Sequence, residues 1–320
     1  MRLKDFYKTV VDEGIGADPR GRAFVTGELK RTAEEYKKTK EADKAGFDQD
    51  RLFNPYADTR VLNGDLNSVI KRVMVGIDID AGELAVADRY SEKTAKVDLV
   101  LSHHPAGKAY ANFYEVMGMQ SEIFHKAGVP INIAENTMAP RKKDVERRVL
   151  PANHTKAVDA AKLLNINMMC AHTAADNFVS TYLTKLFAEQ KPERLKDILD
   201  ILKEIPEYRL ATENNTGPKL FSGSENSRTG RVFVDMTGGT EGPKEIYESA
   251  SKAGIGTFVG MHYSEEHRKE LEKQFINVVV AGHISSDNLG LNLLFDSVMK
   301  KCGKFEIVEC SGYRRVSRLK

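Results

Sequence analysis

The chain contains no tryptophan, only three cysteines and almost no net charge. Cys170, Cys302 and Cys310 form no C-x-x-C pair, and their odd number argues against a disulfide framework, so we expect a reducing compartment. Lysine and arginine together number 48 against 46 aspartates and glutamates, which leaves a net charge of +2. This balance, without basic-aromatic tracts, argues against nucleic acid as the main partner.

Long apolar runs are missing as well. No segment approaches the roughly 18–20 apolar residues of a membrane span, and residues 1–14 are charged where a signal peptide would be apolar. We therefore expect a cytoplasmic protein without a membrane partner. Its 320 residues, 41% hydrophobic and 29% charged, are typical of a globular enzyme with one elaborate domain or two smaller ones.

Short apolar runs, each followed by a helical-period segment, begin near Lys71. This alternation predicts an α/β fold with largely parallel or mixed sheets. The spacing of apolar residues also predicts an amphipathic helix over Leu195–Ile205. The predicted strands are Val73–Ile79, Val97–Ser102, Pro130–Ala134, Ile166–Ala171, Arg231–Met236, Gly256–Met261, Ile276–Ala281 and Phe305–Val308.

The N-terminal part of the chain differs in composition from the rest. Glu28–Lys44 mixes both charges at helical spacing and lacks a full apolar stripe, which predicts a solvated helix or a partner-binding arm. The polar stretch Glu189–Asn226 is predicted to link two halves. The expected domains are a charged helical extension (1–50), a first α/β lobe (51–190, to which 291–320 returns) and a second α/β lobe (191–290).

A weak internal repeat supports two related lobes. Residues 166–177 read INMMCAHTAADN and residues 276–288 read INVVVAGHISSDN. Both contain Ile-Asn, an apolar strand and then His-x-x-x-Asp-Asn. The repeated polar ending is harder to explain by chance than the apolar part, so we expect two α/β units of similar construction.

Histidines and aspartates follow three of the predicted strands, where ligands of open α/β sheets gather. Taken singly, each is explained by an ordinary loop or helix-cap role, Asp287 as an N-cap above all. Together they favour a metal site, because imidazole and carboxylate suit Zn, Mn, Fe or Co and a carboxylate can bridge two ions. The residues concerned are His103 and His104, His172 and Asp176, and His283 and Asp287.

Three regions of the sequence resemble the Ngg-one-interacting factor three-like family, whose members are often labelled GTP cyclohydrolase I type 2 homologues. They are ADTRVLNG (57–64) with VMVGIDID (73–80) and VDLVLSHHP (97–105), then NINMMCAHTAADN (165–177), then VVVAGHISSDN (278–288). The resemblance implies two similar α/β lobes that enclose a dinuclear metal site, and ring-shaped hexamers. The implied ligands of the two divalent ions are His103, His104, Asp176, His283 and Asp287, with His172 beside them.

The sequence departs from the family pattern in three ways. Asp287 stands where glutamate is usual, so its shorter side chain must sit closer to the ions or bind only one of them. The charged N-terminal region is extra, and the stretch from Ala106 to Leu163 is longer than the usual link. The last two differences bear on substrate and assembly more than on the metal site.

Several other segments are weaker candidates for a binding or catalytic role. A basic cluster is either a phosphate site or, more simply, a solvated helix face; it comprises Arg141, Lys142, Lys143, Arg147 and Arg148. The amides of Met236–Gly242 either bind an anion or form a tight strand–helix turn. Glu135, His262 and Glu265 follow predicted strands and are candidates for a general base or a residue that supports the metal ligands.

The leading functional hypothesis is a metal-dependent hydrolase that acts on a small, phosphorylated or nucleotide-like substrate, with His172 or Glu135 moving the proton. The alternative is a non-catalytic protein that handles metal or regulates a partner, which the charged N-terminal region fits better. The two hypotheses differ in one structural feature: the metals of a catalytic site keep open coordination positions that face a cavity.

Overall fold

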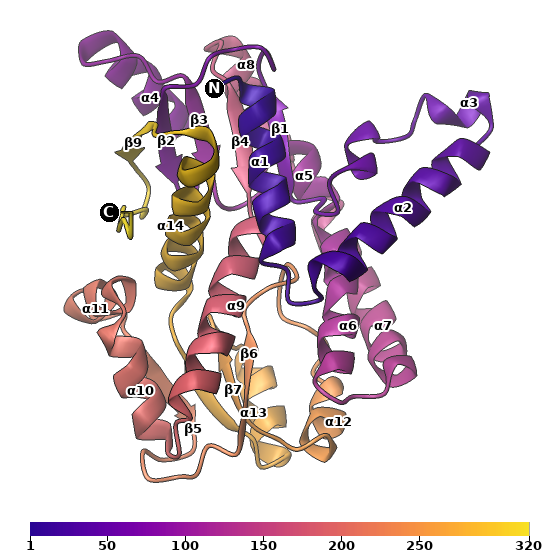
Figure 1. The fold of residues 1–320 in the computed structure, drawn as a ribbon, viewed down its shortest axis with the longest axis vertical. Coiled ribbons are helices and arrows are strands. Elements are labelled where there is room, and N and C mark those ends of the chain that lie inside the picture. Colours follow the sequence, from indigo (N-terminus) through magenta and orange to yellow (C-terminus); the bar gives the residue numbers. More distant parts are fainter. Residues whose placement is uncertain (320) are drawn as a thin grey trace.

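The computed structural model describes residues 1–319 and contains two mixed β-sheets (Figure 1). The first has the order β1-β4-β3-β2-β9 and the second the order β5-β8-β7-β6. The first-sheet strands are β1 (Thr59–Asn63), β4 (Met168–Ala171), β3 (Leu99–Ser102), β2 (Arg72–Gly76) and β9 (Glu306–Glu309). The second-sheet strands are β5 (Lys219–Ser222), β8 (Asn277–Val280), β7 (Ile255–Gly260) and β6 (Arg231–Asp235).

The two sheets repeat one arrangement, which confirms the prediction of an α/β fold with two related lobes. In each sheet the strands pair in parallel except the one that comes first in the chain. That strand, β1 or β5, lies antiparallel at the edge beside the strand of the sequence repeat, β4 or β8. The strand order β1-β4-β3-β2 therefore corresponds to β5-β8-β7-β6.

Helices cover both faces of the first sheet. Val73 and Val75 pack on one side, against the N-terminal and C-terminal helices, and Met74 packs on the other. This alternation follows from the two-residue period of a strand. The helices on the first side are α1 (Leu3–Gly16), α9 (Thr173–Gln190) and α14 (His283–Cys302); those on the second are α4 (Ala81–Lys93) and α8 (Lys156–Leu163).

The second sheet is covered in the same way. Val234, Val259 and Val279 face α9 and the amphipathic α10, and Phe233 and Phe258 face the opposite side. The helices of these two layers are α10 (Leu195–Glu204) and α11 (Pro206–Glu213), then α6 (Met119–Lys126), α7 (Ile131–Val149), α12 (Ile246–Lys252) and α13 (Glu265–Lys273). Shorter elements are α5 (Gly107–Ala111), η1 (Gln49–Leu52) and η2 (Phe113–Gly118).

The helices α9 and α14, which follow the two repeated strands, pack closely against each other between the sheets (Figure 1). Gly290 makes this approach possible, since a Cβ atom there would lie 2.6 Å from the carbonyl oxygen of Ala175. The contact lies within one turn of Asp176 and Asp287. The separation of the two helices therefore sets the separation of these two carboxylates.

We expect the Gly290→Ala variant to unfold more easily and to bind metal more weakly. The added methyl group must push α14 away from α9, and such overpacking costs about 1–3 kcal/mol. Chemical denaturation and elemental analysis measure the two effects. Gly82→Ala in α4 is the matched control, because no atom lies within 4 Å of a Cβ there. Equal stability and metal content in both variants would contradict this account.

The N-terminal region contains one core helix and one protruding arm. Leu3, Phe6 and Val10 of α1 are fully buried against the first sheet. Only part of residues 1–50 therefore extends from the body of the molecule. By contrast, α2 (Arg22–Lys38) buries only Val25, and with α3 (Glu41–Lys44) it projects from the body of the molecule (Figure 1). The solvated helix expected within Glu28–Lys44 is confirmed.

Two further predictions need correction. Pro130–Ala134 is not a strand, because α7 starts there and buries Ala134, Met138, Val145 and Val149 at helical spacing. A short apolar run does not by itself distinguish a strand from a buried helix turn. Glu189–Asn226 is no simple linker either, since it contains α10, α11 and β5. The domain boundaries remain predictions.

Candidate metal centre

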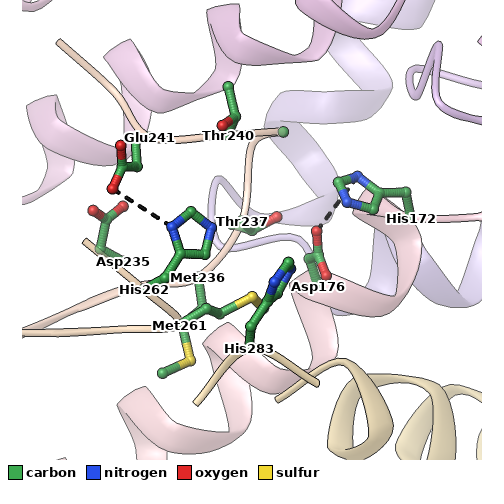
Figure 2. Close-up of a pocket in the computed structure, with 11 residues that line it drawn as sticks. His172, Asp176, Asp235, Met236, Thr237, Thr240, Glu241, Met261, His262 and His283 are labelled. Atoms are coloured by element: carbon green, nitrogen blue, oxygen red, sulfur yellow. Dashed lines mark ion pairs between the residues drawn. The ribbon is translucent and has the colours of Figure 1, made fainter. Parts of the chain in front are cut away.

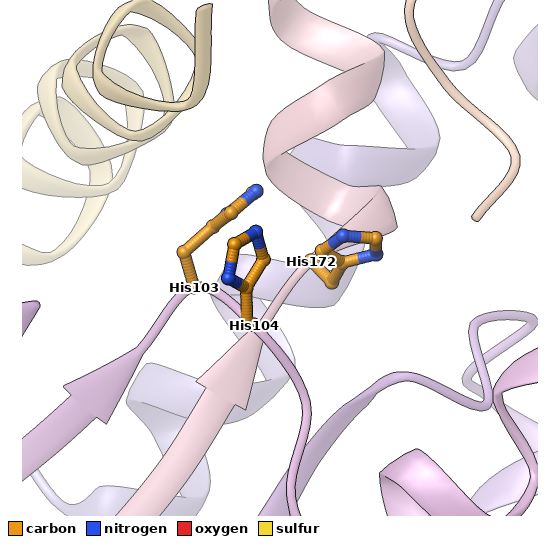
Figure 3. Close-up of side chains that lie close together, drawn as sticks. All are labelled: His103, His104 and His172. Atoms are coloured by element: carbon orange, nitrogen blue, oxygen red, sulfur yellow. The ribbon is translucent and has the colours of Figure 1, made fainter. Parts of the chain in front are cut away.

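His103 and His104 directly follow β3, and His172 directly follows β4 (Figure 3). The backbone amides of His103 and His104 donate to the carbonyl oxygens of Gly76 and Ile77, at 2.9 and 3.0 Å, so this turn stays attached to the neighbouring strand. His103 Nδ1 lies 3.1 Å from the carbonyl oxygen of Ala171. These bonds fix both imidazoles at the carboxyl edge of the first sheet.

The two carboxylates come from near the N-terminal ends of the paired helices. Asp176 lies in the first turn of α9, and Asp287 lies four residues after His283, the first residue of α14. Because residues four apart share one helix face, His283 Nε2 lies 3.6 Å from Asp287 Oδ2. Asp287 is fully buried and Asp176 nearly so.

These side chains form two groups that share Asp287. On one side, His103 Nε2 lies 3.4 Å from both Asp176 Oδ1 and Asp287 Oδ1. On the other, His104 Nε2 lies 3.6 Å from Asp287 Oδ2, as His283 Nε2 does. Within each group the potential ligand atoms all lie within 4.8 Å of one another, so either group could hold a metal ion.

The unpaired polar atoms of the cluster fit metal ions. His103 Nε2, Asp176 Oδ1 and both carboxylate oxygens of Asp287 are buried and have no hydrogen-bond partner among the described residues. Such atoms are costly to bury unless something else binds them. In a tetrahedral site with metal–ligand distances of about 2.1 Å, two ligand atoms lie about 3.4 Å apart. The separations of 3.4 and 3.6 Å match that spacing.

The charges of the centre show how strongly it attracts a cation. Burial alone lowers the pKa of His103, but the carboxylates of Asp287 and Asp176 outweigh it and raise this pKa well above its usual value. Burial and the neighbouring imidazoles lower the pKa of His104 to about 4, so His104 is neutral and available as a ligand at neutral pH. The ligand nitrogen of His104 is fixed because Nδ1 donates to Asp78 Oδ1 at 2.7 Å.

His172 belongs to a carboxylate–imidazole pair beside these groups. Its Nδ1 lies 2.9 Å from Asp58 Oδ2, and Thr173 Oγ1 donates to the same oxygen at 2.6 Å. Its ring centroid lies 4.8 Å from that of His103, and the ligand atoms of His103, His104 and His172 form a third cluster. Sequence reasoning missed Asp58, although Asp58 lies within the ADTRVLNG segment that carries the family resemblance.

A pocket opens next to the centre, and the second lobe supplies most of its wall (Figure 2). His262 Nδ1 lies 3.5 Å from Glu241 Oε1, and the His262 ring centroid lies 4.9 Å from that of His283. The structure thus brings His262, a weak candidate from the sequence, to the site. The other lining residues are His172, Asp176, Asp235, Met236, Thr237, Gly239, Thr240 and Met261.

The remaining sequence candidates lie elsewhere. Glu135 is on α7 and lines a different pocket beside Arg20, so its expected position at a strand end is wrong and it does not reach the histidines. Glu265 is in the first turn of α13 and pairs with Arg268. In the basic cluster, Arg141, Arg147 and Arg148 contact Asp144, and Lys142 contacts Glu115.

Asp235 was also missed by sequence reasoning, and it predicts a dependence of stability on pH. Burial raises its pKa to about 6 in the metal-free protein. The folded state therefore holds this proton more tightly than the unfolded chain does, and folding loses stability as pH rises from about 4 to about 6. We expect Asp235→Asn to stabilise the metal-free protein by about 2 kcal/mol at pH 8 and to have little effect at pH 4.

Denaturant unfolding in the presence of chelator at the two pH values measures this difference. Asp200→Asn, at an exposed position of α10, is the matched control. Equal effects of Asp235→Asn at pH 4 and pH 8 would show that the Asp235 carboxyl ionises normally.

Comparison with known proteins shows what this architecture is similar to. No protein-family model and no curated protein sequence matches the chain. Among solved structures, a NIF3 superfamily protein from Sphaerobacter thermophilus matches with a TM-score of 0.71 and 27% identity, over 90% of this chain and 98% of the other. Reduced HcgD from Methanocaldococcus jannaschii matches at a TM-score of 0.48 and 17% identity, over 78% and 87% of the two chains. The protein TTHA1606 from Thermus thermophilus matches at a TM-score of 0.44 and 16% identity, over 89% and 96%.

Proposed function

Because this chain is a NIF3-like protein, with the motifs of the Ngg-one-interacting factor three-like family in its sequence, we propose that it binds two divalent metal ions and is a metal-dependent hydrolase. The substrate class proposed is a small phosphorylated or nucleotide-like molecule. The ions proposed are Zn, Fe, Mn or Co, since the ligand set combines imidazole and carboxylate.

The observation that carries the proposal is the position of the Asp287 carboxylate. Its two oxygens are both buried and unpaired, and each faces a different set of partners. One ion would be held by His103, Asp176 and Asp287, and the other by His104, His283 and Asp287. The aspartate that replaces the usual glutamate would thus contribute to both ions, since Asp287 belongs to both groups.

Bound metals would supply Lewis-acid chemistry and lower the pKa of a coordinated water to near neutrality. The chain's own residues supply orientation and proton transfer. Asp58 accepts from His172 Nδ1, and a ring nitrogen of His172 lies within 4.8 Å of ring nitrogens of His103 and His104. His172 is thus the residue proposed to accept and return the proton. Glu135 lines a different pocket, which favours His172 over it for this role.

Elemental analysis of protein purified without chelator or added metal tests the proposal. We expect about two transition-metal equivalents per chain in the wild type and none in a variant with His103→Ala and Asp287→Ala. Phosphate esters and nucleotides are then screened for hydrolysis by the two proteins. A wild type that contains no metal and takes up neither Zn nor Mn would refute the proposal.

A non-catalytic role in metal handling or in regulation is the second candidate, and the protruding α2–α3 arm favours it. The pocket beside the metal centre favours catalysis, since a catalytic site needs open coordination positions that face a cavity. Hydrolysis of none of the screened substrates by the fully loaded wild type would favour the non-catalytic role.

We also propose a homo-oligomer, by the resemblance to a family that forms ring-shaped hexamers. The fold match to the Sphaerobacter thermophilus protein covers nearly the whole of both chains, which supports a similar subunit shape. Light scattering during size-exclusion chromatography tests this, and a monomer at micromolar concentration would contradict it.

Among residues 1–319, no helix has both the length and the apolar character that crossing a membrane requires.

A further inference from the structure

The loop between β6 and α12 contains backbone amides without acceptors. Among residues 1–319, no hydrogen bond is donated by the N–H groups from Gly238 to Gly242. Gly238 and Gly239 have φ values of 95° and 92°, a left-handed conformation that favours glycine. The loop does not form the tight strand–helix turn considered above, because α12 starts only at Ile246.

Gln120 of α6 holds the loop from behind. Its side-chain amide nitrogen donates to the carbonyl oxygens of Gly238 and Thr240, at 2.7 and 2.8 Å. Arg141 Nε donates to the carbonyl oxygen of Glu241 at 3.1 Å. Gln120 is buried, so it has little freedom to release the loop. The carbonyl groups of the loop therefore point toward α6 and α7.

The same bonds determine where the amides point. No peptide bond in the described part of the chain is cis, and in a trans peptide the N–H points away from the C=O of the preceding residue. The N–H groups of Gly239 and Glu241 must therefore point away from Gln120. The metal-site pocket is the cavity next to these amides, since Gly239, Thr240 and Glu241 line it together with His262 and His283 (Figure 2).

We propose that the amides of Gly239 and Glu241 form the subsite for the phosphate group of the substrate. Successive amides held in a concave loop bind phosphate oxygens through several N–H donors at once. Gln120 is the positioning residue, because it orients the loop from outside the pocket. This subsite rests on the metal centre proposed above. The phosphate group would bind the amides while the reacting bond of the same substrate lies at the metal ions.

The charges around the pocket allow an anion to bind once metals are present. Two divalent cations exceed the charge of the two ligand carboxylates, Asp176 and Asp287. The Glu241 carboxylate is already engaged, since it accepts from the amide of Ser264 at 2.6 Å and lies 3.3 Å from His267 Nδ1. Asp235 lies 3.4 Å from the hydroxyl of Tyr263, which donates to it. A bound phosphate thus faces amides and cations more than free carboxylates.

The amide of Gly239 can be observed directly. Gly238-Gly239 is the single Gly-Gly pair in the sequence, so carbonyl-13C and amide-15N labelling of glycine gives one HNCO signal, that of Gly239. We expect inorganic phosphate to shift this signal in the metal-loaded wild type. Calorimetric titration should show at least tenfold weaker phosphate binding in Gln120→Met, which keeps the side-chain volume and removes both donors. Gln190→Met, at the exposed end of α9, is the matched control.

Elemental analysis of the same samples separates the two proposals. Loss of phosphate affinity in Gln120→Met at unchanged metal content supports the subsite. If phosphate binds and the Gly239 signal does not shift, phosphate binds to the metals alone and the subsite is overturned. The absence of phosphate binding to the metal-loaded wild type would also overturn the subsite. A wild type that contains no metal would instead refute the metal centre. Elemental analysis alone reveals this outcome, independently of phosphate binding.

Discussion

Replacement of Asp287 by alanine is expected to remove both metal ions, whereas replacement of Asp176 or His283 removes only one. Asp287 belongs to both ligand groups, with one oxygen 3.4 Å from His103 Nε2 and the other 3.6 Å from His104 Nε2. Without it each ion keeps two protein ligands, too few for a stable tetrahedral site. Hydrolysis of any substrate found by screening should fall to the uncatalysed background.

The measurement is metal content per chain, taken beside the thermal unfolding of each variant. Asp296→Ala is the matched control, because Asp296 is a buried aspartate of the same helix that pairs with Arg315 and does not face the centre. It should lower stability and leave the metal content intact. One full equivalent of metal retained by Asp287→Ala would show that Asp287 serves a single ion.

The cluster of histidines and aspartates that could hold metal was predictable from the sequence, because each of these residues follows a clearly apolar strand. The repeat INMMCAHTAADN and INVVVAGHISSDN marks β4 and β8. The helix that follows each strand carries the aspartate, Asp176 in the first turn of α9 and Asp287 four residues after the start of α14. Convergence of strand ends at one sheet edge is a general property of α/β folds. Local pattern and fold class together were therefore enough to group these residues.

The residues that support the ligands were not predictable in this way. Asp58, Asp78 and Gln120 act through contacts with residues 26 to 120 positions away in the chain. No local period marks such a contact, since register and helix packing decide it. Asp58 directly precedes β1, a strand at the sheet edge in which only Val61 and Leu62 are apolar.

The similarity of the two lobes goes further than the repeat in the sequence. His104 is the second residue after β3, and its Nδ1 faces Asp78 from the loop after β2. His262 is the second residue after β7, and its Nδ1 faces Glu241 from the loop after β6. Because β3 corresponds to β7 and β2 to β6, the two histidine–carboxylate pairs occupy equivalent positions. The short segments HHP and MHY are too different for this match to be found from sequence alone.

Removal of the metals is expected to lower the melting temperature by at least about 10 °C. At a free metal concentration about 1,000 times Kd, each site contributes about 4 kcal/mol to the stability of the folded state. One kcal/mol corresponds to roughly 2–4 °C for chains of 150–250 residues, and to less for a longer chain. Chelation also leaves the oxygens of Asp287 buried without a partner, which adds a cost that the loaded protein does not carry.

Thermal unfolding before and after chelation, and again after metal is added back, measures this effect. Asp287→Ala is the control, since a protein that binds no metal should not respond to chelator. An ion held by His104 and His283 would join the end of β3 in the first sheet to the segment that follows β8 in the second. Its loss should therefore loosen the contact between the lobes and raise hydrogen exchange in the first turn of α14. An unchanged melting temperature after verified metal loss would show that packing of α9 against α14 alone holds the lobes together.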